Sequence, residues 1–404
     1  MDFFWILASL RRQRAIALLI VLEVAFTCAI VCNIMFLISD RLTRMDHSSG
    51  VAEAELIRVR VAAIGKKPDA KSLTALDLGA LRALPGVTSA AVTNMVPFGG
   101  SAWNTSASTI RDDPSPPINV AMYMGGPTLL ETFGVRVTAG RAFTPDDFVD
   151  YDQANPPAVP SIIITRRVAE RLFPGKDPIG QELYVTGPSP QRVVGVIDQL
   201  ARPNDFDGPE NAGYAVVVSQ ALTYPVARNY VLRVDAGRRD EVLSGIDAAL
   251  AQVDPNRIVV ARQTFAEVRA GFFKQDRAMI YLLLTVSLAL LVVTALGIVG
   301  LASFWVQKRT RQIGIRRALG ATRRDIVRYF QLENFVLATI GIVGGMVLAF
   351  AINAWLIRAY HVPRLPGSVL PFGAVTLWIL GQIAVLGPGL RASRIPPAIA
   401  TRMV

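Results

Sequence analysis

The densest group of chemically distinctive side chains lies in a short basic segment at residues 308–328. Its sequence is KRTRQIGIRRALGATRRDIVR, in which eight residues are Lys or Arg and one, Asp325, is acidic. Side chains of this kind pair with an acidic protein surface, with lipid head groups or with the phosphates of a nucleic acid. The elements around the segment decide among these three kinds of binding.

Long apolar runs flank the basic segment, and this position indicates a cytoplasmic loop of a membrane protein. Residues 39–278 hold 26 Lys or Arg against 27 Asp or Glu, whereas the rest of the chain holds 16 against 4. The formal net charge of +11 therefore belongs to the flanks of the apolar runs. This distribution follows membrane topology, and it argues against nucleic acid as a partner.

Few side chains in this sequence are suited to catalysis or metal binding. The two histidines, His47 and His361, and the two cysteines, Cys28 and Cys32, form neither a metal-ligand pattern nor a Ser-His-Asp triad. The cysteines are poorly spaced for a disulfide on one helix, so we expect them to serve packing. Glu23 lies inside the first apolar run, and a structural carboxyl is favoured over a proton relay. We expect no enzymatic activity, no metal and no cofactor bound by this chain.

Four apolar runs have the length of a membrane-spanning helix. We expect the spans at residues 15–38, 279–305, 333–357 and 371–390. The short segments between and beyond them are a cytoplasmic N-terminal segment at 1–14, a cytoplasmic loop at 306–332, an outer loop at 358–370 and a cytoplasmic tail at 391–404. The three inner segments carry 3, 8 and 3 Lys or Arg, which orients both termini toward the cytoplasm.

The region at 39–278 is large enough for one or two soluble domains, and it mixes helical and strand patterns. We expect helices at 73–84, 166–173 and 239–253, and strands at 87–92, 161–165, 182–186, 192–197, 214–218 and 229–234. From about residue 264 a stalk helix is expected to continue without a break through Trp305. Candidate internal boundaries lie near 110–118 and 203–225, which suggests a middle insertion between flanking halves that pack together. The predicted fold class is four transmembrane α-helices with an α+β domain inserted between the first and second spans.

A stripe of small residues marks one face of the third span. Gly341, Gly345, Ala349 and Asn353 fall four apart, a spacing that lets two helices approach closely. Packing within the monomer and packing against a second copy both fit the stripe, and the sequence leaves the two open.

Several stretches of the chain resemble one family of membrane proteins. IGIRRALGATRRDIVRYFQLENF (313–335) is similar to the cytoplasmic loop of the MacB/FtsX/LolC-type permeases of ATP-binding cassette (ABC) systems. The outer region is similar to the MacB-like periplasmic domain at 133–147, 161–185 and 193–197, and the tail at 387–402 resembles the closing motif of the family. The likeness covers nearly the whole chain in matching order. It is closest to the half-size permeases that lack a fused ATPase.

No phosphate-binding loop accompanies the resemblance. The sequence holds no Gly-x-x-x-x-Gly-Lys-Ser/Thr, and the nearest stretch, at 174–177, lacks the earlier glycine and the hydroxyl residue. ATP and Mg²⁺ would then be bound by a separate ABC ATPase. In this family the loop after the second span docks on the ATPase, and stalk helices carry its motion to the outer domains. The resemblance implies the same for this chain.

The middle of the basic segment is the predicted contact with the ATPase. Gly314 and Gly320 are expected to flank a short helix at 315–319, whose apolar side chains enter a groove while the arginines pair with an acidic rim. Topology and lipid head groups alone would not require this order of Gly and Ile. The predicted contact residues are Ile313, Gly314, Ile315, Arg316, Arg317, Ala318, Leu319, Gly320 and Ala321.

The resemblance fits two functions. The first is a permease subunit in the bacterial inner membrane that drives export of small antimicrobials, peptides or lipidic molecules from the periplasm. Its partners would be the ATPase and a second permease copy or paralogue, with a periplasmic adaptor and an outer-membrane channel as further candidates. The second is an FtsX-like signalling subunit that controls a periplasmic cell-wall hydrolase. The size and MacB-like pattern of the outer region favour export.

Overall fold

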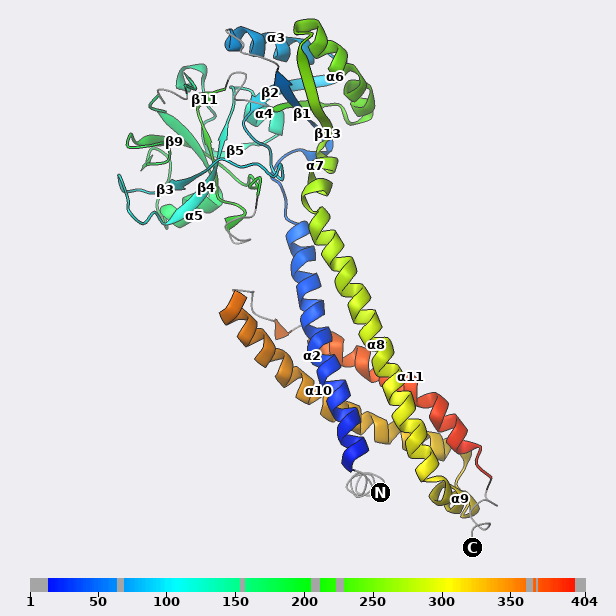
Figure 1. The fold of residues 1–404 in the computed structure, drawn as a ribbon. Coiled ribbons are helices and arrows are strands. Elements are labelled where there is room, and N and C mark those ends of the chain that lie inside the picture. The colour runs from blue at the N-terminus through cyan, green and yellow to red at the C-terminus, as the bar shows by residue number, and fades with distance from the viewer. Residues whose placement is uncertain are drawn as a thin grey trace. The chain divides into compact units, whose positions relative to one another are not determined.

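The computed structural model describes residues 14–63, 69–152, 157–204, 211–222, 229–360, 366–367 and 370–396 (Figure 1). It has two compact units: a helical unit of Met1–Met45 with Asp276–Val404, and an α/β domain of Asp46–Gln275. Most of the predicted N-terminal segment, part of the predicted outer loop and the end of the predicted tail lie outside the described residues. The predicted fold class is confirmed, because an α/β domain lies between the first and second of four candidate spans.

Four helices among the described residues are long and apolar enough to cross a membrane. They are α2 (Arg14–Met45), α8 (Lys274–Lys308), α10 (Arg323–Tyr360) and α11 (Leu370–Ser393). A helix that is apolar on all sides has no aqueous face, so a lipid environment suits each of them. The four predicted spans fall inside these helices, and each helix extends beyond its apolar run.

The four long helices share one apolar core but are not packed alike. Helix α10 packs along α2 and α11, whereas α8 meets α2 through a few polar contacts. The hydroxyls of Thr27 and Thr294 are 2.8 Å apart, and Asp276 near the start of α8 forms ion pairs with Arg41 and Arg44 of α2 at 2.5 and 3.1 Å. These contacts tie α8 to α2 by hydrogen bonds and charge.

Both ends of the α/β domain sequence contribute to a four-stranded antiparallel sheet in the order β13-β1-β12-β2. Its strands are β1 (Leu56–Ala63), β2 (Val87–Thr93), β12 (Asn229–Val234) and β13 (Arg257–Thr264). Helices α3 (Ala70–Arg82) and α6 (Arg239–Val253) pack against one face of this sheet (Figure 1). Asp69 begins α3, because its side chain accepts a hydrogen bond from the backbone N–H of Ser72.

The middle of the α/β domain sequence forms a larger mixed sheet in the order β3-β4-β10-β7-β9-β5, with β8 beside β9. Its strands are β3 (Asn104–Ala107), β4 (Ile118–Met124), β5 (Val137–Gly140), β7 (Ser161–Thr165), β8 (Glu182–Leu183), β9 (Gln191–Ile197) and β10 (Ala215–Val218). Short elements complete the domain: η1 (Glu53–Glu55), α4 (Leu129–Phe133), η2 (Pro145–Asp147), β6 (Val149–Asp150), α5 (Arg166–Leu172), β11 (Gln220–Ala221), η4 (Ala236–Arg238) and α7 (Phe265–Phe272).

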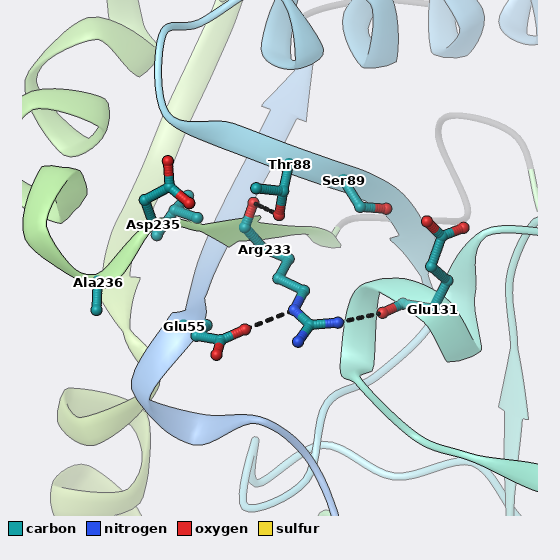
Figure 2. A pocket seen from close by; sticks show the side chains of 8 residues that line it. Glu55, Thr88, Ser89, Glu131, Arg233, Asp235 and Ala236 are labelled. Atoms are coloured by element: carbon teal, nitrogen blue, oxygen red, sulfur yellow. Dashed lines mark hydrogen bonds and ion pairs between the residues drawn. The ribbon is translucent and has the colours of Figure 1, made fainter.

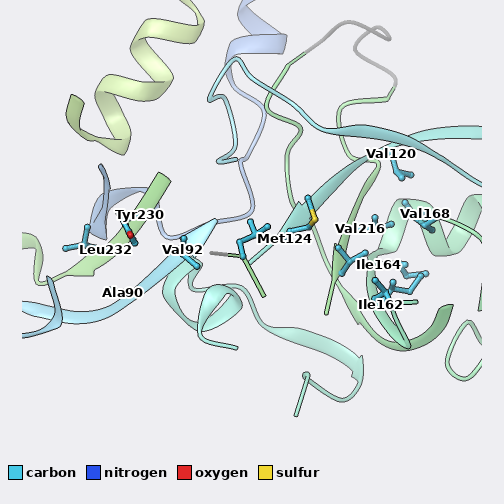
Figure 3. Close-up of a cluster of buried hydrophobic side chains, with 14 of the residues drawn as sticks. Ala90, Val92, Val120, Met124, Ile162, Ile164, Val168, Val216, Tyr230 and Leu232 are labelled. Carbon is cyan, nitrogen blue, oxygen red and sulfur yellow. The ribbon is translucent and has the colours of Figure 1, made fainter. Parts of the chain in front are cut away.

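One hydrophobic core runs through both sheets of the α/β domain (Figure 3). The smaller sheet contributes Tyr230 and Leu232, and the larger sheet contributes Ile162, Ile164 and Val216. Every residue of β7 is buried, because this strand lies between β9 and β10 and both of its faces are covered.

The predicted insertion is present, but three details of the prediction are wrong. The first internal boundary lies between β2 and β3, because the segment near 110–118 only connects β3 to its neighbour β4. The strand predicted at 182–186 shortens to Glu182–Leu183. The stalk helix is interrupted at Phe273, since α7 ends at Phe272 and α8 begins at Lys274. Phe273 is buried, and its ring centroid lies 5.3 Å from that of Phe98. At the break between the two helices the chain is thus held by side-chain packing.

Candidate functional site

The basic segment folds into a nine-residue helix, α9 (Thr310–Ala318), between α8 and α10. Gly320 ends it with a φ of 101°, a left-handed conformation that favours glycine. The N–H groups of Gly320 and Ala321 donate to the carbonyls of Arg317 and Arg316 at 3.1 Å each. Gly314 lies inside α9, so the expectation that it would flank the helix is wrong.

A capping box begins α10 immediately after this turn. The N–H of Thr322 donates to a carboxylate oxygen of Asp325 at 2.9 Å, and the N–H of Asp325 donates to the Thr322 hydroxyl at 3.3 Å. The turn between α9 and α10 is therefore fixed at both ends by local hydrogen bonds.

The apolar side chains of α9 divide between two sides of the helix. Ile313 is 5% exposed and packs into the core of the helical unit. Ile315 is 45% exposed and Leu319 is 83% exposed, and their spacing of four places them on one side. Ile313 is thus engaged within the chain, and the apolar surface open to a partner is formed by Ile315 and Leu319.

The predicted contact arginines already make contacts inside the chain. The guanidinium of Arg316 lies 4.6 Å from the ring centroid of Tyr329, and Arg317 donates to the carbonyl of Ile395 at 2.5 Å. Arg316 remains exposed, as do Ala318 and Gly320, while Ala321 is half-buried. The exposed edge of α9 thus combines two apolar side chains with one aromatic-stacked cation.

A buried ion pair that the sequence did not predict lies beneath α9. Arg309 donates to both carboxylate oxygens of Glu333 at 3.0 and 3.1 Å, and the two side chains are 7% and 2% exposed. The guanidinium also lies 4.6 Å from the ring centroid of Trp305. Glu333 is an acidic residue in an otherwise apolar run, which was the only signal available in the sequence.

The small-residue stripe of α10 packs against α2 within the chain. A Cβ added at Gly341 would lie 2.8 Å from the Cβ of Val24, and one added at Gly345 would lie 2.5 Å from the Cβ of Cys28. The helices can approach this closely because both residues are glycine.

The rest of the stripe continues the same contact. Ala349 is fully buried, and its carbonyl accepts a hydrogen bond from Asn33 of α2 at 3.5 Å. Asn353 is also buried. Of the two alternatives that the sequence left open, packing within the monomer accounts for the buried positions of all four residues.

Two further residues singled out from the sequence lie in the same helical unit. Cys28 and Cys32 are free and buried, in agreement with a packing role. The carboxyl of Glu23 lies against α8 at Gly297, where even an added methyl group would overlap it.

The α/β domain carries a pocket of about 360 Å³ beside the smaller sheet (Figure 2). Arg233 crosses it, donating through Nε to Glu55 at 2.6 Å and through Nη1 to the carbonyl of Glu131 at 3.4 Å. Asp235 and Ser89 also line it. None of the site residues predicted from the sequence is among the described residues that line the pocket, and Arg233, the cation among those lining residues, is paired within the chain.

Two family models together cover most of the chain. Residues 18–264 match the MacB-like periplasmic core domain, and residues 284–397 match the FtsX-like permease C-terminal region. The second match contains α9 and its contacts with α10 and α11.

Individual relatives are ABC transporter proteins. The chain is 27% identical over 279 residues to the uncharacterized ABC transporter permease YknZ of Bacillus subtilis, covering 66% of each chain. It is 27% identical over 296 residues to the macrolide export ATP-binding/permease protein MacB of Agrobacterium fabrum, covering 69% of this chain and 43% of that protein. It is 27% identical over 266 residues to the pyoverdine export ATP-binding/permease protein PvdT of Pseudomonas entomophila, covering 63% and 39%. The chain thus spans less than two thirds of the length of these relatives.

Solved structures with some likeness cover about half of this chain. The extracellular domain of the transporter YknZ from Gram-positive bacteria matches at 14% identity and a TM-score of 0.32, covering 50% of this chain and 100% of that chain. The periplasmic region of MacB from Actinobacillus actinomycetemcomitans matches at 11% identity and a TM-score of 0.34, covering 57% and 97%.

The family assignment rests on the two models, which account in order for the first span, the α/β domain, the second span, α9 and the last two helices. The chain belongs to the family of ABC transporter permeases that combine a MacB-like periplasmic core domain with an FtsX-like permease C-terminal region.

Proposed function

We propose that this chain is the transmembrane subunit that couples ATP hydrolysis by a separate ABC ATPase to motion of its α/β domain in the periplasm. The observation that carries the proposal is the exposed edge of α9. Leu319 and Ile315 are large exposed apolar side chains, and Arg311 and Arg316 are exposed cations of α9. An exposed apolar pair with cations nearby in the sequence suits a groove with an acidic rim on a partner.

The proposed orientation of the chain in the membrane rests on the distribution of charge. The segments at 306–332 and 391–404 hold most of the basic excess, so they belong on the cytoplasmic side, where ATP is available. The chain would then lie in the bacterial inner membrane with both termini inside. A second copy or a paralogue would complete the permease.

Export is the favoured direction of transport. Two of the relatives are named for export of a macrolide and of pyoverdine, and the MacB-like model covers residues 18–264. Small antimicrobials, peptides and lipidic molecules remain the candidate substrates. The alternative, control of a cell-wall hydrolase, has no specific observation in its favour. A neighbouring gene for a membrane-fusion adaptor would support export, and one for a coiled-coil hydrolase would support signalling.

The docking surface can be tested with the double substitution I315D/L319D. Two carboxylates on the exposed edge of α9 would leave charges in an apolar groove, so we expect recovery of the ATPase with the purified permease to fall at least tenfold. The ATPase to test would be an ABC ATPase encoded beside the gene of this chain. Leu76, an exposed leucine of α3, provides the matched control L76D, which should leave recovery unchanged. Equal recovery with I315D/L319D would refute docking at α9.

A further inference from the structure

We propose that the buried ion pair between Arg309 and Glu333 is a positioning contact that makes α9 and α10 move as one body. A displacement of α9 would then displace α10 by the same amount, because the joint between the two helices would not bend. The source of that displacement rests on the proposed function above, whereas the contact itself can be tested on this chain alone.

The geometry places the pair where α9 begins. Arg309 is the residue that precedes the first turn of α9, and Glu333 lies about three turns into α10. One nitrogen of the guanidinium reaches both carboxylate oxygens, at 3.0 and 3.1 Å, and the guanidinium plane also meets the Trp305 ring. An arginine held at two oxygens and at a ring has little freedom to turn.

Few side chains of α9 are buried. Of its nine residues, Ile313 and Gly314 are buried, and the rest are half-buried or exposed. Such a short helix does not keep its orientation through its own hydrogen bonds. Among the described residues, its anchors are the Ile313 side chain, the stacking of Arg316 on Tyr329, the bond from Arg317 to the carbonyl of Ile395 and the ion pair at its start.

The pair also lies where α10 meets α11. The neighbour of Glu333 in α10, Asn334, is buried, and a Cβ added at Gly381 of α11 would lie 3.0 Å from the Asn334 side-chain nitrogen. A displacement delivered to Glu333 would thus act on α10 at its contact with α11.

Stability alone does not account for a buried pair of this kind. Removing two charges from water is costly, and apolar residues of similar size often stabilise a protein equally well or better. Replacing both partners by apolar residues therefore separates the two roles. R309M/E333L should preserve the packing of the helical unit and remove the directional contact.

The experiment is hydrogen exchange of the full chain in detergent, with thermal unfolding as the measure of stability. In R309M/E333L we expect the backbone amides of α9 to exchange at least tenfold faster, while those of α10 beyond Gly341 and the midpoint of unfolding stay unchanged. R309K keeps the charge but loses the planar fork, so its α9 amides should exchange at an intermediate rate. The matched control is R311M, because Arg311 is an exposed cation of the same helix.

Unchanged exchange of α9 in both R309M/E333L and R309K would overturn the proposal. A second measurement uses the complex with the ATPase, in which a non-hydrolysable ATP analogue should alter exchange in the α/β domain of the wild type but not of R309M/E333L. Failure of the wild-type chain to bind the ATPase would refute the proposed function. The comparison of α9 exchange in the chain alone would still decide the role of the ion pair.

Discussion

At the scale of single residues, Asp147 connects three parts of the α/β domain. Its carboxylate accepts hydrogen bonds from Arg141 at 2.6 and 2.9 Å, from the N–H of Thr144 at 2.7 Å and from the hydroxyl of Ser161 at 2.8 Å. The Arg141 guanidinium is the largest cause that holds the pKa of this carboxyl well below its usual range, and Thr144 and Ser161 lower it further. The loop around η2 is thereby fixed to strand β7.

The substitution D147N should destabilise the α/β domain by about 2 kcal/mol at neutral pH, because it removes charge-assisted hydrogen bonds from a buried position. The pKa of Asp147 is lower in the folded than in the unfolded state, where it is about 3.9. Its contribution is therefore fully present above about pH 5 and is lost as the pH falls toward the folded pKa. Thermal unfolding of the full chain in detergent should show the difference between wild type and D147N shrinking below about pH 4. A difference that is constant with pH would contradict this account.

The buried ion pairs of the structure were not predicted from the sequence. The side chains of Asp77 and Arg257 are fully buried together, and Tyr230 donates a hydrogen bond to the same carboxylate. These three residues come from α3, β13 and β12, far apart in the chain. Sequence spacing identifies neighbours only within one helix or strand, so a pair assembled from separate elements leaves no pattern to detect.

At the scale of elements, the structure follows the sequence at several strands with a local apolar pattern, although β1, β4 and β13 have such a pattern and were not predicted. Strands β7 and β12 coincide with their predicted ranges, because SIIIT and NYVLRV are rich in β-branched and aromatic residues. Strand β3 (Asn104–Ala107) was missed because its sequence, NTSA, is polar and becomes a strand through pairing with β4. The short helix predicted at 315–319 lies at Thr310–Ala318 in the structure, so its start was misplaced by five residues. The inward position of Ile313 depends on helix phase, which a short segment does not fix.

The contact between α2 and α10 gives a prediction at this scale. A side chain at Gly345 would overlap the Cβ of Cys28 and the carbonyl of Ala25, so G345L must separate two helices. We expect a loss of stability of about 3 kcal/mol, toward the upper end for overpacking, seen as a lower midpoint of thermal unfolding in detergent. Gly344 is exposed, and a Cβ there would have Ala25 at 3.9 Å as its nearest contact. The matched control G344L should therefore leave the midpoint nearly unchanged, and an equal loss in both variants would refute the packing role of the stripe.

At the scale of the whole molecule, two independent cores and one charge asymmetry organise the chain. The α/β domain has a core of its own and near-neutral charge, and the helical unit has a second core with basic ends. A long, near-neutral domain crosses the membrane largely regardless of its charge, whereas short basic segments stay inside. The division into two units and the distribution of charge therefore both fit the membrane topology proposed above.

This topology predicts opposite accessibility for two exposed leucines. Leu76 in α3 and Leu319 after α9 are 60% and 83% exposed, and the span α8 separates them in the chain. In spheroplasts that lack the ATPase, a membrane-impermeant maleimide should label L76C at once and L319C only after permeabilisation. The buried native cysteines, Cys28 and Cys32, provide a low background in the wild-type chain. Labelling of L319C in intact spheroplasts would place α9 on the outside, where no ATPase could reach it, and would overturn both the orientation and the coupling role.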